Sequence, residues 1–230
     1  METTYPLVSC IMPTANREKF IPNAVQYFLR QDYPNKELVI VDDGKDSVES
    51  LIPQHPTINY VRLMNPIATV GEKRNYACSI SKGEIIAHWD DDDWYAANWL
   101  RLGMDALLRT GSDLCGLSNV IFYSPLTKKS WTYVYPPNER PWVCGATMMY
   151  KKDLWKKNPF KPLRIGEDNS FVWNARGKVF AHSLINNFVA FIHPQNTSKK
   201  LTNTRRWVPF PLQEVVSILN SDFSKYQYLN

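Results

Sequence analysis

The sequence predicts an α/β fold built on a mostly parallel central sheet, with helices on both faces of that sheet. Through residues 1–123, short apolar runs of strand length alternate with longer stretches of helical periodicity. Polar residues directly follow three of these runs, as they do at the carboxyl ends of parallel strands. The chain of 230 residues is 44% hydrophobic and 21% charged, which is enough to build a core without disulfides or metals.

The first elements are defined by short apolar runs and their punctuation. Residues 7–12 form an apolar run closed by Pro13, which predicts a buried strand. Apolar side chains recur every three or four positions over residues 20–29, which predicts a helix. Residues 38–41 predict a second buried strand that ends at an Asp-Asp-Gly turn, and residues 59–63 predict a third.

The same alternation continues to residue 123. Residues 71–81 predict a helix that is closed by Gly83. Residues 84–89 predict a fourth strand, which stops at four consecutive aspartates. Apolar spacing over residues 99–107 predicts another helix, and residues 114–123 predict a further strand.

The second part of the chain is less regular. Strand-like segments at 130–135, 143–150 and 188–193 are no longer separated by regular helices. The predicted organisation is one domain over 1–195, with an α/β half over 1–123 and an irregular half over 124–195, followed by a basic extension over 196–230. We expect this extension either to wrap around the domain or to project from it.

The charge is divided between the two parts of the chain. Residues 1–150 carry 14 basic and 17 acidic side chains, a net charge of −3, whereas residues 151–230 carry 13 basic and 5 acidic, a net charge of +8. This asymmetry predicts that the two parts face different partners. The N-terminus lacks the pattern of a secretory signal, and the four cysteines form no CxxC motif, which predicts reduced thiols and a cytoplasmic location.

Three polar clusters are expected to meet at one edge of the sheet. Pro13-Thr14 follows the first predicted strand, Asp42-Asp43 follows the second, and Asp90–Asp93 follows the fourth. In an open parallel sheet, ligands bind at the carboxyl ends of the strands. The sequence contains neither a P-loop nor a GxGxxG fingerprint, so a nucleotide bound there would be held by other groups.

The four aspartates at 90–93 predict a cation site. Adjacent carboxylates repel one another, and a divalent cation removes that cost; hard oxygen ligands suit Mg²⁺ or Mn²⁺. The alternative interpretation is that these aspartates cap the following helix, whose dipole favours negative charge at its start.

Other candidate residues have ordinary alternatives. Gly71 and Arg74 lie at a helix start, where cations are unfavourable, so an anionic ligand or a solvated first turn would explain them. Glu167-Asp168 is either a functional acidic pair or a helix cap, and His193 is either functional or structural.

Taken together and in order, these segments resemble family 2 glycosyltransferases over about residues 6–193. The motifs that carry the resemblance are VSCIMPT at 8–14, LVIVDDG at 38–44, GEKRNYA at 71–77, GEIIAHWDDDDW at 83–94 and GED at 166–168. The resemblance implies the GT-A fold, with a nucleotide-sugar-binding half over about 1–123 and an acceptor-binding half over about 124–195. It also implies a divalent metal and inversion at the anomeric carbon.

The resemblance assigns roles to individual residues. Asp42 corresponds to the residue that recognises the base, usually uracil, and Asp90-x-Asp92 corresponds to the DxD motif, with Asp92 as the foremost metal ligand. Because four aspartates are adjacent, Asp91 and Asp93 remain alternatives. The residues expected to bind the nucleotide are Pro13, Thr14, Asn16, Arg17, Asp42, Asp43, Gly71, Arg74, Asp90 and Asp91. The residues expected to bind Mn²⁺ or Mg²⁺ are Asp92, Asp90 and His193.

Catalysis is assigned to the acidic pair. Asp168 resembles the general base, and Glu167 is either an acceptor-orienting residue or an alternative base. In this interpretation Asp168 takes a proton from an acceptor hydroxyl that attacks C1, while the metal neutralises the departing diphosphate.

The resemblance places the acceptor in the second half of the domain. The acceptor would be a glycan, a lipid-linked molecule or a protein hydroxyl. That half is rich in aromatic residues, which either stack on sugars or pack in the core; they are Trp131, Tyr133, Tyr135, Trp142, Trp155 and Trp173. The basic segment that includes Lys199, Lys200 and Arg205 either contacts an anionic membrane surface or is a solvated tail.

Two other functions compete with glycosyl transfer. A nucleotidyltransferase that forms sugar nucleotides would carry a Gly-rich basic loop after the first strand, and residues 12–17 are not such a loop. A non-catalytic sugar-binding module of the same fold would have no need for Asp92 and Asp168. No recognisable nucleic-acid-binding module is present, so we expect no nucleic-acid partner.

Overall fold

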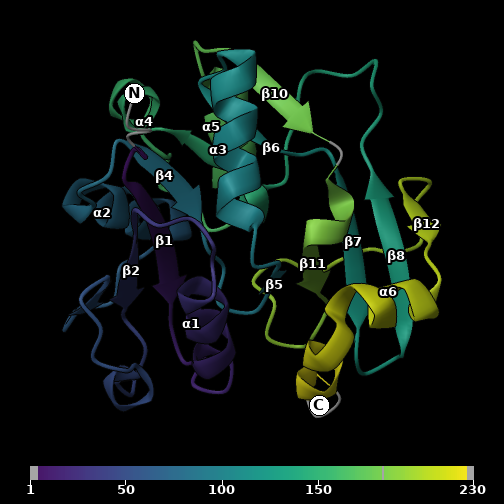
Figure 1. The fold of residues 1–230 in the computed structure, drawn as a ribbon, viewed down its shortest axis with the longest axis horizontal. Coiled ribbons are helices and arrows are strands. Elements are labelled where there is room, and N and C mark those ends of the chain that lie inside the picture. Colours follow the sequence, from purple (N-terminus) through teal and green to yellow (C-terminus); the bar gives the residue numbers. More distant parts are fainter. Residues whose placement is uncertain (1–4, 183, 227–230) are drawn as a thin grey trace.

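The computed structural model describes residues 5–182 and 184–226, which form two sheets lying side by side (Figure 1). The larger sheet has seven strands in the order β10-β6-β9-β4-β1-β2-β3. Its strands are β1 (Val8–Thr14), β2 (Lys36–Asp42), β3 (Ile58–Arg62), β4 (Ile85–His88), β6 (Leu114–Leu117), β9 (Met149–Lys151) and β10 (Val179–His182).

The smaller sheet has five strands in the order β12-β8-β7-β11-β5. Its strands are β5 (Trp94–Tyr95), β7 (Asn119–Ser124), β8 (Lys129–Val134), β11 (Phe188–Phe191) and β12 (Trp207–Pro209). The α-helices are α1 (Ile21–Leu29), α2 (Val70–Ile80), α3 (Trp99–Thr110), α4 (Lys152–Lys157), α5 (Glu167–Asn174) and α6 (Leu212–Leu219). None of the helices in the described part of the chain is long and apolar enough to span a membrane.

The prediction of a mostly parallel central sheet is confirmed. Strands β4, β1, β2 and β3 pair in parallel, and β10 is parallel to β6. Only β9 runs antiparallel, between β4 and β6. The order of the parallel strands brings the ends of β1, β2 and β4 to one edge, because each strand enters the sheet from the same side.

Helices cover both faces of this sheet. The side chains of β1 alternate between the two faces, and buried apolar side chains lie on both. Cys10 and Met12 belong to a core that includes residues of α1 and α3. Ile11 points the other way, into a second core with residues of α2, α4 and α5. A buried parallel strand with apolar side chains on both faces therefore reads as a continuous apolar run, as the sequence of 7–12 does.

Two of the predicted strands differ in the structure. The strand expected over 114–123 is divided at Ser118, where the chain leaves the larger sheet as β6 and enters the smaller one as β7. The strand expected over 143–150 is instead a 3₁₀ turn at Gly145–Thr147 followed by the short β9. Both errors have the same cause, because an apolar run does not reveal which partner strand it will pair with.

The C-terminal segment wraps around the domain. Strand β12 pairs with β8, and Val215 and Leu219 of α6 are buried in the main core. Beyond α6, Asp222 accepts a hydrogen bond from Trp94 Nε1 at 2.8 Å and pairs with Arg30. These contacts hold the end of the described chain against β5 and α1.

Candidate active site

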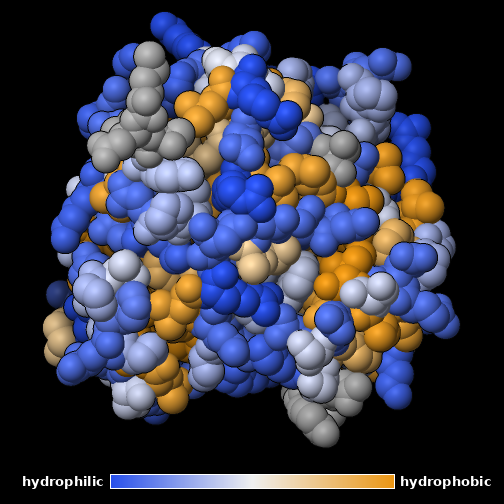
Figure 2. Space-filling model, viewed as in Figure 1, coloured by the Kyte–Doolittle hydropathy of each residue, from blue (hydrophilic) through white to orange (hydrophobic). Residues whose placement is uncertain are grey.

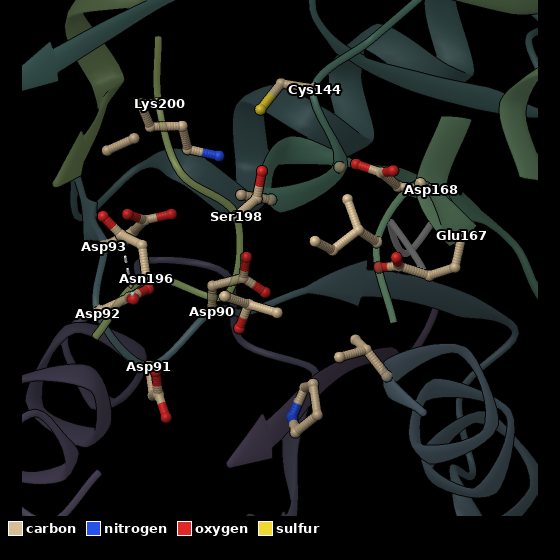
Figure 3. Close-up of a pocket in the computed structure, with 18 of the residues that line it drawn as sticks. Asp90, Asp91, Asp92, Asp93, Cys144, Glu167, Asp168, Asn196, Ser198 and Lys200 are labelled. Atoms are coloured by element: carbon tan, nitrogen blue, oxygen red, sulfur yellow. Dashed lines mark hydrogen bonds between the residues drawn. The ribbon is translucent and has the colours of Figure 1, made fainter. Parts of the chain in front are cut away.

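A cavity of about 660 Å³ lies at the carboxyl ends of β1 and β4 and extends toward the N-terminus of α5. The aspartates at 90–93 lie on one side of this cavity and the Asp168 carboxylate on the other (Figure 3). The predicted site residues that line it are Pro13, Thr14, Arg17, Arg74, Asp90, Asp91, Asp92, Glu167 and Asp168. Those that do not line it are Asn16, Asp42, Asp43, Gly71 and His193.

The structure brings the three polar clusters together. Thr14 Oγ1 donates to Asp91 Oδ2 at 2.6 Å, which joins the end of β1 to the aspartates that follow β4. The backbone N–H of Asp43 donates to the Thr14 carbonyl at 3.3 Å, and Lys73 Nζ donates to the same carbonyl at 3.1 Å while pairing with Asp43. The convergence expected of parallel strands is therefore observed.

Asp42 is enclosed by its own loop. The side chain is fully buried and accepts hydrogen bonds from the backbone of Gly44 at 2.9 Å and Val48 at 3.2 Å. Tyr60 donates to it at 2.8 Å, and Arg62 pairs with it at 2.8 Å. These contacts fix the loop that follows β2, and they leave the Asp42 carboxylate outside the cavity.

The four aspartates point in different directions. Asp91 is held by Thr14 and Arg17, whereas Asp92 pairs with Arg17 and lies 3.0 Å from His193 Nε2. Asp90 pairs with Arg74 at 3.2 Å. Asp93 accepts the backbone N–H of Phe191 at 3.1 Å, toward β11.

Burial, neighbouring charges and hydrogen bonds give these carboxyl groups different pKa values. Burial, together with the neighbouring Asp92 charge, raises the pKa of Asp91 to about 7. Burial would also raise the pKa of Asp92, but the hydrogen bond with His193 and the charge of Arg17 lower it to about 2. Asp92 is therefore the carboxylate of this cluster that is best held in its ionised form.

The donor atoms fit a hard or borderline divalent cation. Carboxylates of Asp90 and Asp92 suit Mg²⁺ or Mn²⁺, and the imidazole of His193, a softer ligand, lies beside Asp92. Within residues 5–182 and 184–226, no three His, Cys, Asp or Glu side chains are arranged to hold an ion. The Arg17 guanidinium, which bridges Asp91 and Asp92, is the cation that balances these charges. A metal bound by Asp92 would compete with it.

The acidic pair at the start of α5 is divided in role. Gly166 precedes the helix with a φ of +84°, a left-handed conformation that glycine adopts readily. Glu167 is buried and pairs with Arg74 at 3.3 Å; burial raises its pKa. Asp168 lines the cavity and accepts the backbone N–H of Asn169 at 2.7 Å. Of the two, only Asp168 has no ion-pair partner among the described residues.

Arg74 joins the two sides of the site. Its buried guanidinium contacts Asp90, Glu167 and, at 2.9 Å, Nδ1 of His88. Burial and the Arg74 charge hold the pKa of His88 well below its usual range, so this imidazole is neutral and accepts the bond. The guanidinium expected to meet a diphosphate is thus engaged by protein groups.

Some residues that line the cavity, and one that contacts Arg74, were not found from the sequence. His88 lies inside an apolar strand, and no local pattern distinguishes it from a core residue. Residues 195–198 and Lys200 line the cavity, although all of them except Gln195 belong to the extension predicted over 196–230. Asn196 Nδ2 lies 3.4 Å from Asp92 Oδ2, and Arg17 donates to the Gln195 carbonyl at 2.7 Å. Only the folded chain brings this segment, 193–200, over the aspartates.

The aromatic residues of the second half divide between site and core. Tyr133 and Trp142 line the main cavity, and Trp142 Nε1 donates to Asn169 Oδ1 at 2.6 Å. Tyr135 stacks on Trp142, with ring centroids 5.0 Å apart, beside a second cavity of about 430 Å³. Trp155 instead donates to Asn75 at 2.8 Å and packs against the second core.

The GT-A fold that the sequence motifs predict agrees with the mostly parallel sheet and with the acidic cluster that faces a helix-borne carboxylate across the cavity. The sequence model of Glycosyl transferase family 2 matches residues 9–175. This match covers more than half of the chain, and the chain belongs to this family.

Individual proteins agree with this assignment. The chain is 32% identical over 175 residues to the Escherichia coli enzyme named UDP-Glc:alpha-D-GlcNAc-diphosphoundecaprenol beta-1,3-glucosyltransferase WfgD, which covers 73% of this chain and 68% of that protein. Curated relatives are matched over 19% to 68% of their own length, so the chain spans only part of most of them.

Solved structures share the fold. S. aureus TarS 1-349 in complex with UDP-GlcNAc has a TM-score of 0.65 at 18% identity, over 95% of this chain and 73% of that one. The mannosyltransferase PcManGT of Pyrobaculum calidifontis, in complex with GDP-Man and Mn²⁺, has a TM-score of 0.62 at 18% identity, over 83% of this chain and 57% of that one. At this identity the likeness concerns the GT-A fold.

Proposed function

We propose that the protein is an inverting, metal-assisted glycosyltransferase that transfers a sugar from a UDP-linked donor to an acceptor hydroxyl. The observation that carries this proposal is the position of Asp168. Its carboxylate lines the same cavity as Asp90 and Asp92, on the opposite side from them (Figure 3). A donor held at the aspartates would present C1 toward that carboxylate.

The acid–base role follows from the division within the acidic pair. Glu167 is engaged with Arg74, and its removal from that pair would leave a buried cation unbalanced. Asp168 is free to accept a proton from an acceptor hydroxyl as the hydroxyl oxygen attacks C1. Attack from the side opposite the leaving diphosphate inverts the configuration at C1.

The residues that would hold a metal are Asp92 and Asp90, with His193 beside Asp92. When bound, Mn²⁺ or Mg²⁺ supplies Lewis-acid stabilisation of the diphosphate. The protein groups position that charge: His193 and Arg17 keep Asp92 ionised, and Thr14 fixes the neighbouring Asp91.

The printed names of the relatives support a nucleotide-sugar donor. WfgD is named for UDP-Glc, the TarS structure contains UDP-GlcNAc and the structure of the mannosyltransferase PcManGT contains GDP-Man. Two of these three carry uracil, so we take UDP as the donor nucleotide and GDP as its competitor.

The acceptor is proposed to be a lipid-linked glycan at the cytoplasmic face of a membrane, by analogy with the diphosphoundecaprenol substrate in the WfgD name. Figure 2 shows apolar surface over the five-stranded sheet, interspersed with hydrophilic side chains. Leu201 is 68% exposed and Val208 is 47% exposed, close in sequence to the exposed Lys199 and Arg205. Such a mixed surface is suited to peripheral membrane contact.

A donor screen followed by one substitution tests the proposal. We expect UDP with Mn²⁺ to raise the melting temperature more than GDP does. Asp168→Asn should keep that shift while losing transfer by about 100- to 10,000-fold. Asp153→Asn, which removes an exposed carboxylate outside the cavity, serves as the matched control. Transfer by Asp168→Asn at the wild-type rate would rule out the assigned base.

A further inference from the structure

The acidic groups that line the cavity outnumber its cationic groups by one, and most of those cations are already paired with carboxylates. Six acidic side chains line it, namely Asp90, Asp91, Asp92, Asp93, Glu167 and Asp168. Five cationic side chains line it, namely Arg17, Lys73, Arg74, Arg164 and Lys200. A substrate phosphate entering this space therefore needs a cation that is not already neutralised by the protein.

Three of the five cations are already engaged. Arg17 bridges two aspartates and also donates to the Gln195 carbonyl. Lys73 pairs with Asp43, and Arg74 pairs with both Asp90 and Glu167. Turning any of them to a phosphate would strip a partner from a buried carboxylate, which costs several kcal/mol.

The other two cations have no carboxylate partner within the described ranges. Arg164 is exposed at the rim and donates through Nε to the Ala68 carbonyl at 3.3 Å. Lys200 is half-buried, and its ammonium lies 5.8 Å from the centroid of the Phe122 ring. Figure 3 shows this ammonium pointing into the cavity, toward the space between Ser198 and Cys144. Among the described residues, Lys200 is thus the cation that reaches into the cavity without forming an ion pair.

The position of Lys200 is fixed by the segment that carries it. Residues 193–200 approach the aspartates through His193, whose Nε2 lies 3.0 Å from Asp92, and through Asn196. The neighbouring Lys199 is exposed and does not line the cavity. The two adjacent lysines, which the sequence alone groups in one basic patch, therefore face different surroundings.

We propose that Lys200 is a phosphate-binding residue of this site, donating a charge-assisted hydrogen bond to a substrate phosphate. This inference rests on the proposed function, since it is the sugar-nucleotide donor or a phosphorylated acceptor that brings the phosphate. A lysine ammonium binds phosphate as a compact point charge and does not need the paired geometry of a guanidinium.

If the phosphate is that of the donor, Lys200 acts on the leaving group. The acceptor oxygen forms a bond to C1 and its proton passes to Asp168. The C1–O bond to the diphosphate breaks, and its electron pair stays on the phosphate oxygen. The ammonium would offset the negative charge that accumulates there, in addition to any charge offset by a metal.

The test compares Lys200→Met with Lys199→Met, which removes the same charge from the adjacent, exposed position. Titration calorimetry in Mn²⁺ measures the affinities for UDP, GDP, uridine and inorganic pyrophosphate. We expect Lys200→Met to weaken binding of UDP and pyrophosphate by about 10-fold, because it removes one charge-assisted bond. The affinity of Lys200→Met for uridine should stay within about twofold of wild type. The affinities of Lys199→Met for UDP and pyrophosphate should also stay within about twofold.

A second arm identifies the source of the phosphate. If Lys200→Met leaves UDP and GDP affinity unchanged but weakens binding of glycerol 3-phosphate to the UDP-saturated protein, the residue serves the acceptor phosphate. Equal losses in the two lysine variants, or no loss with any phosphate probe, would overturn the inference. Wild-type protein that binds neither UDP nor GDP contradicts the proposed donor, and the pyrophosphate arm then decides the role of Lys200 on its own.

Discussion

Gly145 packs directly against Asp168. A Cβ atom at position 145 would lie 2.8 Å from Asp168 Cβ and 2.9 Å from its Cγ, closer than real Cβ contacts allow. The 3₁₀ turn that contains Gly145 and the first turn of α5 therefore fit together only because this side chain is absent. This turn therefore limits where the side chain of Asp168, the candidate base, can lie.

We predict that Gly145→Ala lowers kcat by about 10- to 100-fold, because a displacement of the base of about 1 Å is enough to cost that much. The affinity for the donor nucleotide should stay unchanged, since no hydrogen bond joins Gly145 to Asp90–Asp93 among the described residues. Steady-state kinetics and calorimetry on the same protein separate the two effects. A parallel loss of nucleotide affinity would show that the turn also shapes the donor site.

Arg74 is predicted to stabilise the fold as well as the site. Its side chain is 7% exposed and that of Glu167 is 8% exposed, so Arg74→Met leaves buried carboxylates without a partner. We expect a loss of about 3–5 kcal/mol in the free energy of unfolding, measured in urea. Glu167→Gln in the same chain should recover about 1–3 kcal/mol, because the two residues act as a pair. Strictly additive effects would contradict this coupling.

The metal assignment predicts an order among the aspartates. Asp92→Asn should weaken the Mn²⁺-dependent part of UDP binding by at least about 10-fold, since this carboxylate is the best ionised and lies beside His193. Asp91→Asn is the comparison variant, because Thr14 holds that carboxyl group and its pKa is raised to about 7, whereas that of Asp92 is lowered. UDP titrations at increasing Mn²⁺ and in EDTA measure the difference. A larger effect of Asp91→Asn would reassign the ligand.

The parts of the fold that the sequence predicted are those set by local pattern. The strands at β1, β2 and β3 follow from apolar runs and their turn signals, and α1 and α3 follow from helical spacing. The division of one apolar run at Ser118 was missed because the choice of sheet is made by distant partners, β9 and β10 for β6 but β8 and β11 for β7.

The candidate site shows the same limit. The convergence of Thr14 with Asp91 was predictable, because the topology of parallel strands alone brings their ends together. The enclosure of Asp42 was not, because Tyr60 and Arg62 reach it from the neighbouring strand. Lys200 enters the cavity through the path of the whole C-terminal segment, for which spacing in the sequence has no signal.

We predict that the buried His182 makes the protein less stable in mild acid. It lies at the end of β10, it is 8% exposed, and its Nδ1 has no hydrogen-bond partner among the described residues. Burial lowers its pKa from 6.5 to about 4. The native state therefore keeps the imidazole neutral at a pH where the unfolded chain already binds a proton.

The sign follows from proton binding. Between about pH 6.5 and pH 4 the unfolded chain binds more protons than the native state, so the His182 contribution is complete above pH 6.5 and is lost as the pH falls toward 4. The difference between these two pKa values corresponds to about 3 kcal/mol. Asp91, whose pKa is raised to about 7, has the opposite effect on stability over an overlapping pH range. The free energy of unfolding of wild type alone therefore does not isolate the effect of His182.

The difference in the free energy of unfolding between wild type and His182→Leu removes the contribution of Asp91, which both proteins share. We expect this difference to be constant above pH 7 and to move in favour of the variant by up to about 3 kcal/mol at pH 4, as measured by urea unfolding at each pH. A difference that does not change with pH would mean that His182 titrates normally in the folded protein.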